Sequence, residues 1–285
     1  MRWWIVVGVC VILAWLWPPA PSPSLKSKRV LLCGASMGIG EHIAYRYARE
    51  GAKLVLVARR AAQLQRVADE CYRLGAEGVH VVAADLSREE ECDETVRSAI
   101  SYLGQIDTLI LNHVTQFFQN WDDTKPSERY TIIEKLFRVN TFSYFHIAMS
   151  ALPSLNQTNG HIGVVSSVAG KIGTLKLSPY SATKHALHGF FDSLRQDLHD
   201  RTNVTITTHV LGVIGSKTEV KDGREKAASL IPRASPADAA ESIVIGTEMG
   251  RRETYFPFVQ AYGLSMLYHL WPSGMDALVR FLVAN

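Results

Sequence analysis

One stretch of sequence, VLLCGASMGIG at residues 30–40, decides the fold. Its first four residues are apolar and predict a buried strand, and its glycine-rich turn runs into a helical pattern over Ile39–Glu50 that Gly51 closes. Glycines in such a turn let the chain bend tightly, bring its backbone close to a pyrophosphate and pack the helix on the strand. The N–H groups and the helix dipole would then face the phosphates. The stretch therefore predicts a dinucleotide-binding turn with contacts from Gly34, Ser36, Met37, Gly38, Ile39 and Gly40.

From this turn outward, apolar strands alternate with amphipathic helices. The strands are expected at Lys53–Ala58, Val79–Ala83, Thr108–Leu111, Ile162–Val165 and Val204–Val210. The helices are expected at Ala61–Leu74 with a left-handed cap at Gly75, Arg88–Tyr102, Ser127–Leu152, from Pro179 onward, and Pro236–Met249. Strands that are apolar on both faces are typical of a parallel sheet covered by helices on both sides. We expect a doubly wound α/β fold, the Rossmann fold, as one domain over residues 25–285 that binds ligands beyond the carboxyl ends of its strands.

The composition fits an enzyme of this fold. The 285 residues are 47% apolar and 20% charged, which allows a large core, and the net charge is only +3. Basic residues are interspersed with acidic ones and form no long run, which argues against a nucleic-acid surface. The four cysteines form no CxxC pair and no ligand spacing with histidine, so we expect neither a disulfide framework nor a metal site.

The N-terminus carries an uncharged apolar run, Trp3–Trp17, that ends at Pro18. As a helix it would extend about 22 Å, less than the ~30 Å of a hydrocarbon core. We therefore predict a signal peptide or signal anchor with a proline-rich linker over residues 1–24, and an enzyme of the secretory pathway, either secreted or in the endoplasmic reticulum. The sequons at Asn156 and Asn203 would be usable in the lumen. Whether the leader is cleaved stays open.

The end of the second expected strand indicates which dinucleotide is bound. NAD sites usually place an acidic residue there, whereas this chain has Arg59 and Arg60. Two guanidinium groups suit a 2′-phosphate through charge-assisted hydrogen bonds. The alternative is a solvated basic pair, but cations are slightly unfavourable at a helix start. The pair favours NADP(H) over NAD.

A catalytic arrangement follows the strand Ile162–Val165. Ser167 comes two residues after it, Tyr180 follows, and Lys184 lies four residues further on. With Ser178 as N-cap and Pro179 in the first turn, Tyr180 and Lys184 would share one helix face. A free tyrosine ionises near pH ~10, but an ammonium and a helix N-terminus both favour the phenolate. Tyr180 could then exchange a proton with a carbonyl or alcohol oxygen that Ser167 holds.

With these motifs the sequence resembles the short-chain dehydrogenase/reductase family over about residues 25–260. The resemblance implies that Ser167, Tyr180 and Lys184 act as described, that Lys184 also binds the nicotinamide ribose, and that Asn140 holds a water of the proton relay. It further implies cofactor contacts from Asp85, Leu86, Asn112, His113, Val114, Ile214, Gly215, Ser216 and Thr218.

Within the family, the leader, Asn112-His113-Val114-Thr115 and Leu211-Gly212 resemble the 11β-hydroxysteroid dehydrogenase type 1 branch. This implies a lumenal or secreted NADP enzyme, with a homodimer and a membrane contact as open alternatives. We expect a ketone and a secondary alcohol to be interconverted on an apolar substrate of the hydroxysteroid kind. Thr174 and Lys176 make the loop before Tyr180 less apolar than a steroid pocket suggests. Retinoid or xenobiotic carbonyls, and an NADPH-binding sensor without turnover, are the alternatives.

The C-terminal segment Tyr262–Val283 is rich in Leu, Met, Tyr and Trp. It fits a lid over an apolar pocket, a subunit contact, a membrane-facing patch or plain core packing, and the sequence does not choose among them.

Overall fold

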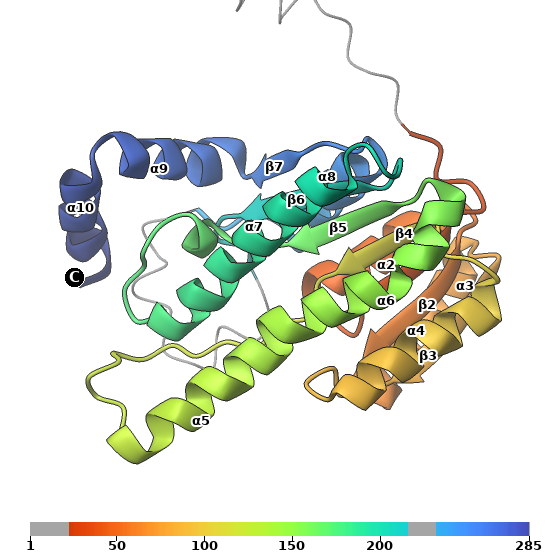
Figure 1. The fold of residues 1–285 in the computed structure, drawn as a ribbon, viewed down its shortest axis with the longest axis horizontal. Helices are drawn as coiled ribbons and strands as arrows, with labels where there is room; N and C mark the ends of the chain where they lie inside the picture. Colours follow the sequence, from red (N-terminus) through yellow and green to blue (C-terminus); the bar gives the residue numbers. More distant parts are fainter. Residues whose placement is uncertain (1–22, 216–231, 285) are drawn as a thin grey trace, which may run out of the picture.

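Seven parallel strands form the centre of the protein, which a computed structural model describes for residues 23–215 and 232–284 (Figure 1). All neighbouring strands are parallel. In spatial order they are β3 (Gly78–Ala83), β2 (Lys53–Ala58), β1 (Arg29–Cys33), β4 (Thr108–Leu111), β5 (His161–Val165), β6 (Thr205–Leu211) and β7 (Glu253–Phe256). The chain reverses its direction across the sheet between β1 and β4, the point at which a doubly wound sheet binds its ligands. The predicted fold class is confirmed.

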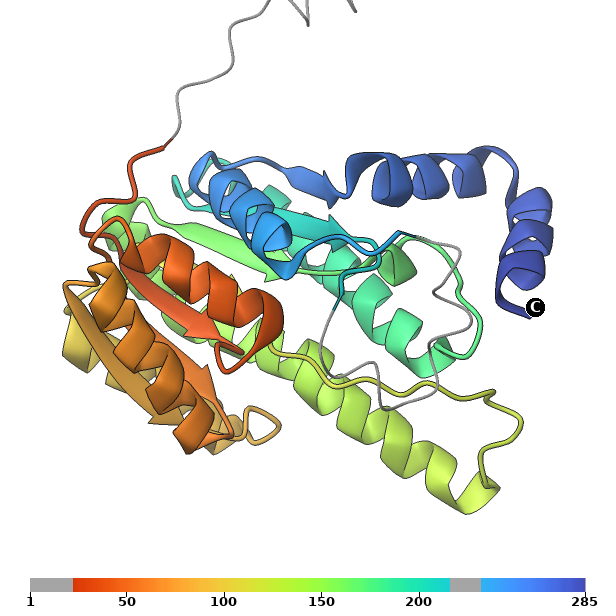
Figure 2. The ribbon, with the colours of Figure 1, turned by 180° about the vertical axis from the view of Figure 1, so that it is seen from behind.

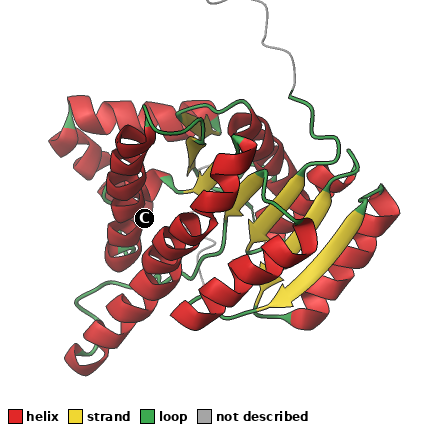
Figure 3. Ribbon diagram, turned by 45° about the vertical axis from the view of Figure 1, so that its right-hand side comes forward, coloured by secondary structure: helices red, strands yellow, loops and turns green. Residues whose placement is uncertain are grey.

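Helices cover both faces of the sheet, as Figures 2 and 3 show from two sides. One face packs against α2 (Gly38–Ala48), α3 (Ala61–Leu74) and α8 (Pro236–Glu248). The other packs against α4 (Glu89–Leu103), α6 (Ser143–Thr158) and α7 (Ser178–Leu198). Successive residues of β1 alternate between the two cores, since Val30 and Leu32 belong to the first and Leu31 and Cys33 to the second. This alternation is why the strands read as continuous apolar runs.

The helix expected over Ser127–Leu152 is interrupted. It consists of α5 (Pro126–Phe137), a π-helical turn over Arg138–Phe142, and α6. In this turn the N–H of Ser143 reaches back to the carbonyl of Arg138. A π turn is a rare, single-turn interruption inside a longer helix, and the apolar spacing of this segment was compatible with one continuous helix. The turn contains Asn140, whose side chain is fully buried.

Further elements differ from expectation. Helix α6 continues through Pro153 to Thr158, beyond the expected end at Leu152. Helix α7 begins at Ser178, which is therefore not the N-cap; Leu177 holds that position and Pro179 stays in the first turn. Strand β7 was not predicted, because its four residues Glu253–Phe256 are short, partly exposed and start with a charge.

The C-terminal segment forms α9 (Phe258–Leu270) and α10 (Pro272–Ala284), which Figure 1 shows at one end of the molecule. Plain core packing is wrong for most of its described side chains. Ala261, Ser265 and Met275 are buried, but large apolar side chains are exposed at Phe258, Val259, Met266, Leu267, Leu270, Trp271 and Phe281. Within residues 23–215 and 232–284, no helix combines the length and the apolar character needed to cross a membrane.

Candidate active site

The glycine-rich turn after β1 needs two of its glycines for close packing. Gly34 has φ +90°, and a Cβ there would lie 2.6 Å from the backbone of His113. A Cβ on Gly40 would lie 2.0 Å from the carbonyl oxygen of Gly34. By contrast, a Cβ on Gly38 would meet nothing within 4 Å, although its φ of +59° favours glycine. The turn is thus packed tightly on the protein side and open at the N-terminus of α2, which suits a phosphate group.

Both predicted arginines lie at the end of β2, beside this turn. Arg59 and Arg60 are exposed, and Arg60 directly precedes α3. One terminal nitrogen of the Arg60 guanidinium donates to Ser36 Oγ at 3.2 Å and lies 2.6 Å from the sulfur of Met37. The guanidinium is therefore held at the rim of the glycine-rich turn, the position that a contact with a 2′-phosphate requires.

The residues after β3 shape the neighbouring turn. Asp85 Oδ1 accepts a hydrogen bond from the Ser87 N–H at 3.1 Å, while the Asp85 N–H donates to Glu91 at 2.6 Å. Leu86 is buried, and its carbonyl accepts from the thiol of Cys92. The Asp85 side chain thus stabilises the loop at the same edge of the sheet.

Residues after β4 connect the glycine-rich turn to the helices. The Asn112 amide donates to the carbonyl of Gly34 at 3.0 Å, and Val114 is exposed. The ring of His113 contacts Ser143 Oγ through Nε2 at 2.7 Å, and that hydroxyl donates to the Val139 carbonyl. Nε2 must therefore carry the proton in this contact. Burial, with the Lys184 charge, lowers the pKa of His113 to about 3, so the ring is neutral.

Tyr180 and Lys184 lie one turn apart at the start of α7, as predicted. Tyr180 is in the first turn and 7% exposed; Lys184 is 2% exposed. The ammonium donates to the carbonyl of Val165 at 2.9 Å and lies 5.9 Å from the Tyr180 ring centroid. Burial lowers the pKa of Lys184 to about 7. A lysine that exchanges its proton near neutral pH, beside a phenol, is suited to proton transfer.

Ser167 lies in a short 3₁₀ turn that packs directly on this part of α7. Its Oγ accepts from the Ala169 N–H at 3.2 Å, which leaves its own hydrogen free to be donated. A Cβ on Gly170, in the same turn, would lie 3.0 Å from the backbone of Lys184. The glycine therefore brings the serine turn against the helix that carries Tyr180.

Asn140 joins the π turn to the site. Its Nδ2 donates to the Thr115 carbonyl and its Oδ1 accepts from the Thr115 N–H, both at 2.8 Å. Nδ2 also lies 3.3 Å from Thr183 Oγ1, which donates to the Tyr180 carbonyl at 2.6 Å. The side chain thus links the loop after β4 to α7, while its relay water remains a prediction.

The segment after β6 is described only in part. Ile214 forms a bridge with Ala234, and the Gly215 N–H donates to the Ala234 carbonyl at 3.0 Å. The predicted contacts Ser216 and Thr218, and the predicted leader, lie outside the described residues.

Sequence reasoning missed the side chains that support the site. Tyr144 is fully buried, donates to the His113 carbonyl at 2.6 Å, and places its ring 5.3 Å from the Lys184 ammonium. Thr183 and His188 were missed as well. A polar residue in an apolar helix pattern was the available signal, but its partner lies far away in the sequence.

The comparisons with known proteins agree with this geometry. Residues 28–227 match the short chain dehydrogenase family. The hydroxysteroid 11-beta-dehydrogenase 1-like protein of Gallus gallus is 41% identical over 93% of this chain and 89% of its own length. The corresponding protein of Xenopus tropicalis is 40% identical over 90% of this chain and 88% of its own length.

Among solved structures, a metagenomic short-chain oxidoreductase in complex with NADP is 26% identical with a TM-score of 0.64, over 78% of this chain and 90% of that one. Together with the geometry of Ser167, Tyr180 and Lys184, these matches show that the chain is an oxidoreductase of the short-chain dehydrogenase/reductase family, in the hydroxysteroid 11-beta-dehydrogenase 1-like branch.

Proposed function

We propose that this protein uses NADP(H) to interconvert a ketone and a secondary alcohol on an apolar substrate of the hydroxysteroid class. The observation that carries the proposal is the placement of Tyr180 and Lys184 on one face of α7, against the Ser167 turn. The names of the relatives support the substrate class, and the NADP complex of the metagenomic relative supports the cofactor.

The described residues fit the cofactor. The open side of the glycine turn would take the pyrophosphate, and the exposed guanidinium groups of Arg59 and Arg60 would take the 2′-phosphate. The cofactor would then run toward its nicotinamide end past Asn112, His113 and Ile214. Bound NADPH supplies the hydride.

In reduction, Tyr180 donates a proton to the carbonyl oxygen as the hydride reaches the carbon. The Ser167 hydroxyl donates to the same oxygen: its Oγ accepts from the Ala169 N–H, which leaves its own hydrogen free to be donated. The Lys184 ammonium and the N-terminus of α7 stabilise the negative charge left on the tyrosine oxygen. In oxidation the Tyr180 oxygen accepts the proton from the substrate alcohol.

The test is NADPH consumption by the purified full chain with a panel of steroids, retinoids and simple ketones, beside a Tyr180→Phe variant. Steroid turnover that the variant lacks supports the proposal. Turnover of retinoids or xenobiotic ketones alone refutes the substrate class, and NADPH binding without any turnover favours a sensor.

We also propose that the enzyme works in the secretory pathway, secreted or in the endoplasmic reticulum. The apolar run over residues 3–17 supports this, as do the exposed sequon residues Asn156 and Asn203. An electrophoretic shift on endoglycosidase treatment of the protein from secretory cells tests it. No shift of the wild-type chain, where a variant with an added control sequon does shift, would refute use of both sequons.

The exposed apolar side chains of α9 and α10 support an outward contact, with a membrane or with a second copy of the chain. Liposome flotation and light scattering of the full chain distinguish these two partners. A monomer that stays out of the lipid fraction refutes both.

A further inference from the structure

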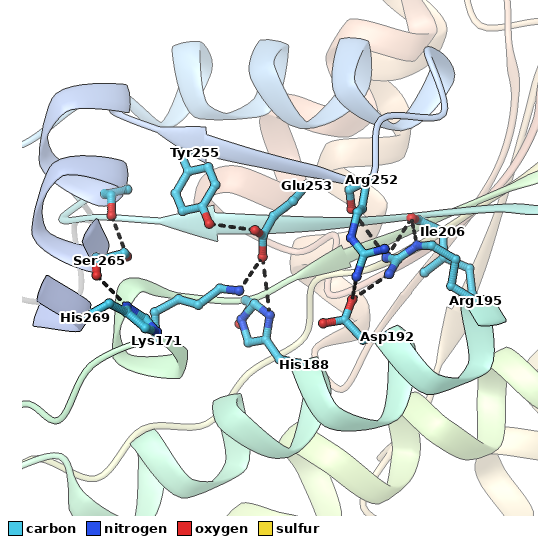
Figure 4. A network of polar contacts seen from close by, with 12 residues as sticks. Lys171, His188, Asp192, Arg195, Ile206, Arg252, Glu253, Tyr255, Ser265 and His269 are labelled. Atoms are coloured by element: carbon cyan, nitrogen blue, oxygen red, sulfur yellow. Dashed lines mark hydrogen bonds and ion pairs between the residues drawn. The ribbon is translucent and has the colours of Figure 1, made fainter. Parts of the chain in front are cut away.

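A second polar cluster lies between α7 and β7, and Figure 4 shows its His188, Glu253 and Lys171. It joins Ser166, the residue just before Ser167, to His188 on α7 and Glu253 on β7. His188 Nε2 lies 3.0 Å from Ser166 Oγ, and its Nδ1 lies 3.5 Å from Glu253 Oε1. Ser166 and His188 are both buried.

The protonation of this cluster follows from its partners. A carboxylate only accepts hydrogen bonds, so Glu253 favours the tautomer of His188 with its proton on Nδ1. Nε2 is then the acceptor for the hydroxyl of Ser166. The contact to Glu253 is too long for a hydrogen bond, and Nδ1 has no other hydrogen-bond partner among the described residues. Its contribution is electrostatic.

The order serine, histidine, glutamate is also that of a hydrolytic triad, but here it is closed to substrate. Ser166 is only 3% exposed. A Cβ on Gly170 would already lie 3.0 Å from Ser166 Oγ, so an acyl carbon has no room beside this hydroxyl. The cluster can therefore hold a hydroxyl in place but cannot use it as a nucleophile.

What the cluster holds is the turn that carries Ser167. Lys184 and His188 are four residues apart on α7 and therefore share a face. Lys184 donates to the carbonyl of Val165, and His188 accepts from the next residue, Ser166. The end of β5 is thus tied to two successive turns of the catalytic helix, immediately before Ser167.

The far end of the same turn is tied to the same carboxylate. Lys171, which follows the 3₁₀ turn, pairs with Glu253 Oε1 at 2.7 Å. Tyr255 donates to Glu253 Oε2 at 2.6 Å and so fixes the carboxylate from the other side. Glu253 is therefore linked to both ends of the turn. It pairs with Lys171 at one end, and His188 connects it to Ser166 at the other.

We propose that His188 is a positioning residue: held between Ser166 and Glu253, it fixes the turn that aims the Ser167 hydroxyl at the substrate oxygen. The proposal rests on the proposed function for the identity of that oxygen. The position of Ser167 itself can be measured without substrate, because the Ala169 N–H donates to its hydroxyl.

The first test compares His188→Leu with His185→Leu in the full chain. His185 is on the same helix but exposed, and its Nδ1 faces the carbonyl of Ser181. We expect the Ala169 amide to exchange its hydrogen about tenfold faster in His188→Leu, with strand amides of β1 unchanged. The control should match the wild type. An unchanged Ala169 amide, or an equal rise throughout the chain, overturns the proposal.

The second test uses turnover in a double-mutant cycle. We expect His188→Leu to lower kcat about tenfold in the wild-type background and to have no further effect in the Ser167→Ala background. His188→Gln, which keeps a polar group toward Ser166, should recover part of kcat. Equal losses in both backgrounds overturn the positioning role. If the wild type turns over no carbonyl at all, the proposed function fails, and the exchange measurement still decides the role of His188.

Discussion

Burial of the Lys184 amine lowers the stability of the fold, and we predict that removing the charge raises it. We expect Lys184→Met to lose turnover and yet to unfold at a higher temperature than the wild type. The side chain is 2% exposed, and burial lowers its pKa from 10.5 to about 7. Methionine fills a similar volume without a charge, so it removes the desolvation penalty and keeps most of the packing.

The size of the gain follows from the pKa. One pKa unit corresponds to ~1.4 kcal/mol, so burial of this amine destabilises the fold by about 4 kcal/mol at pH 7. The hydrogen bond to the Val165 carbonyl, 2.9 Å long, is lost in the variant. Leaving that carbonyl without its hydrogen-bond donor destabilises the variant by about 2 kcal/mol. A net gain of about 2 kcal/mol would raise the Tm by about 5 °C in a chain of this size.

The pH dependence of the Tm distinguishes loss of the buried amine's desolvation penalty from a simple gain in packing. Between pH 7 and 10 the unfolded lysine binds a proton that the folded one has lost, so the wild type gains stability as the pH rises. The Tm difference between Lys184→Met and the wild type should therefore shrink over that range. The assay is calorimetry of the cofactor-free proteins, with the exposed Lys135→Met on α5 as control. A variant that melts below the wild type, or a difference independent of pH, would refute the reasoning.

Three further variants test the site. Tyr180→Phe should keep NADPH affinity within about twofold and lower kcat at least ~100-fold, because only the proton donor is lost; binding titration and turnover measure the two. Replacing Arg59 and Arg60 together with Ala should weaken NADPH binding at least ~10-fold more than NADH binding, and equal losses by titration would contradict a 2′-phosphate site. Gly40→Ala should lower the Tm and abolish NADPH binding, since its Cβ would meet a backbone oxygen at 2.0 Å, whereas Gly189→Ala, with open space around it, should do neither.

The fold was predictable because its signals are local. The segment Lys53–Ala58 is a strand and Ala61–Leu74 a helix with the predicted bounds, and Gly75 has the expected left-handed φ of +108°. Apolar runs, glycine turns and caps act within a few residues of one another, so one sequence suffices to read them. The spacing of Tyr180 and Lys184 was readable for the same reason, because one helix carries both.

What escaped prediction depends on partners far away in the chain. The π turn around Asn140 is held by Thr115, 25 residues earlier, and Glu253 reaches His188 from a strand 65 residues later. The edge strand β7 is too short to have its own pattern. The exposed apolar face of α9 could not be told from a buried one, since both have the same composition.

The order of the strands has a consequence for the chain as it leaves the ribosome. β1 gains its first neighbour, β2, at residue 53, but its other edge stays unpaired until β4 begins at residue 108. At ~5–20 residues per second, the residues between β1 and β4 take roughly 4–15 s to make. Throughout that interval an apolar strand presents a free edge, the kind of edge on which chains aggregate. Asp107, the last residue before β4, helps to bring β4 onto this edge. Its carboxylate accepts hydrogen bonds from the Arg29 N–H and the Arg29 guanidinium at 2.7–2.9 Å. Slower synthesis, which prolongs this interval, or loss of the Arg29–Asp107 pair, would expose nascent chains to misassembly before any part of α7 is made.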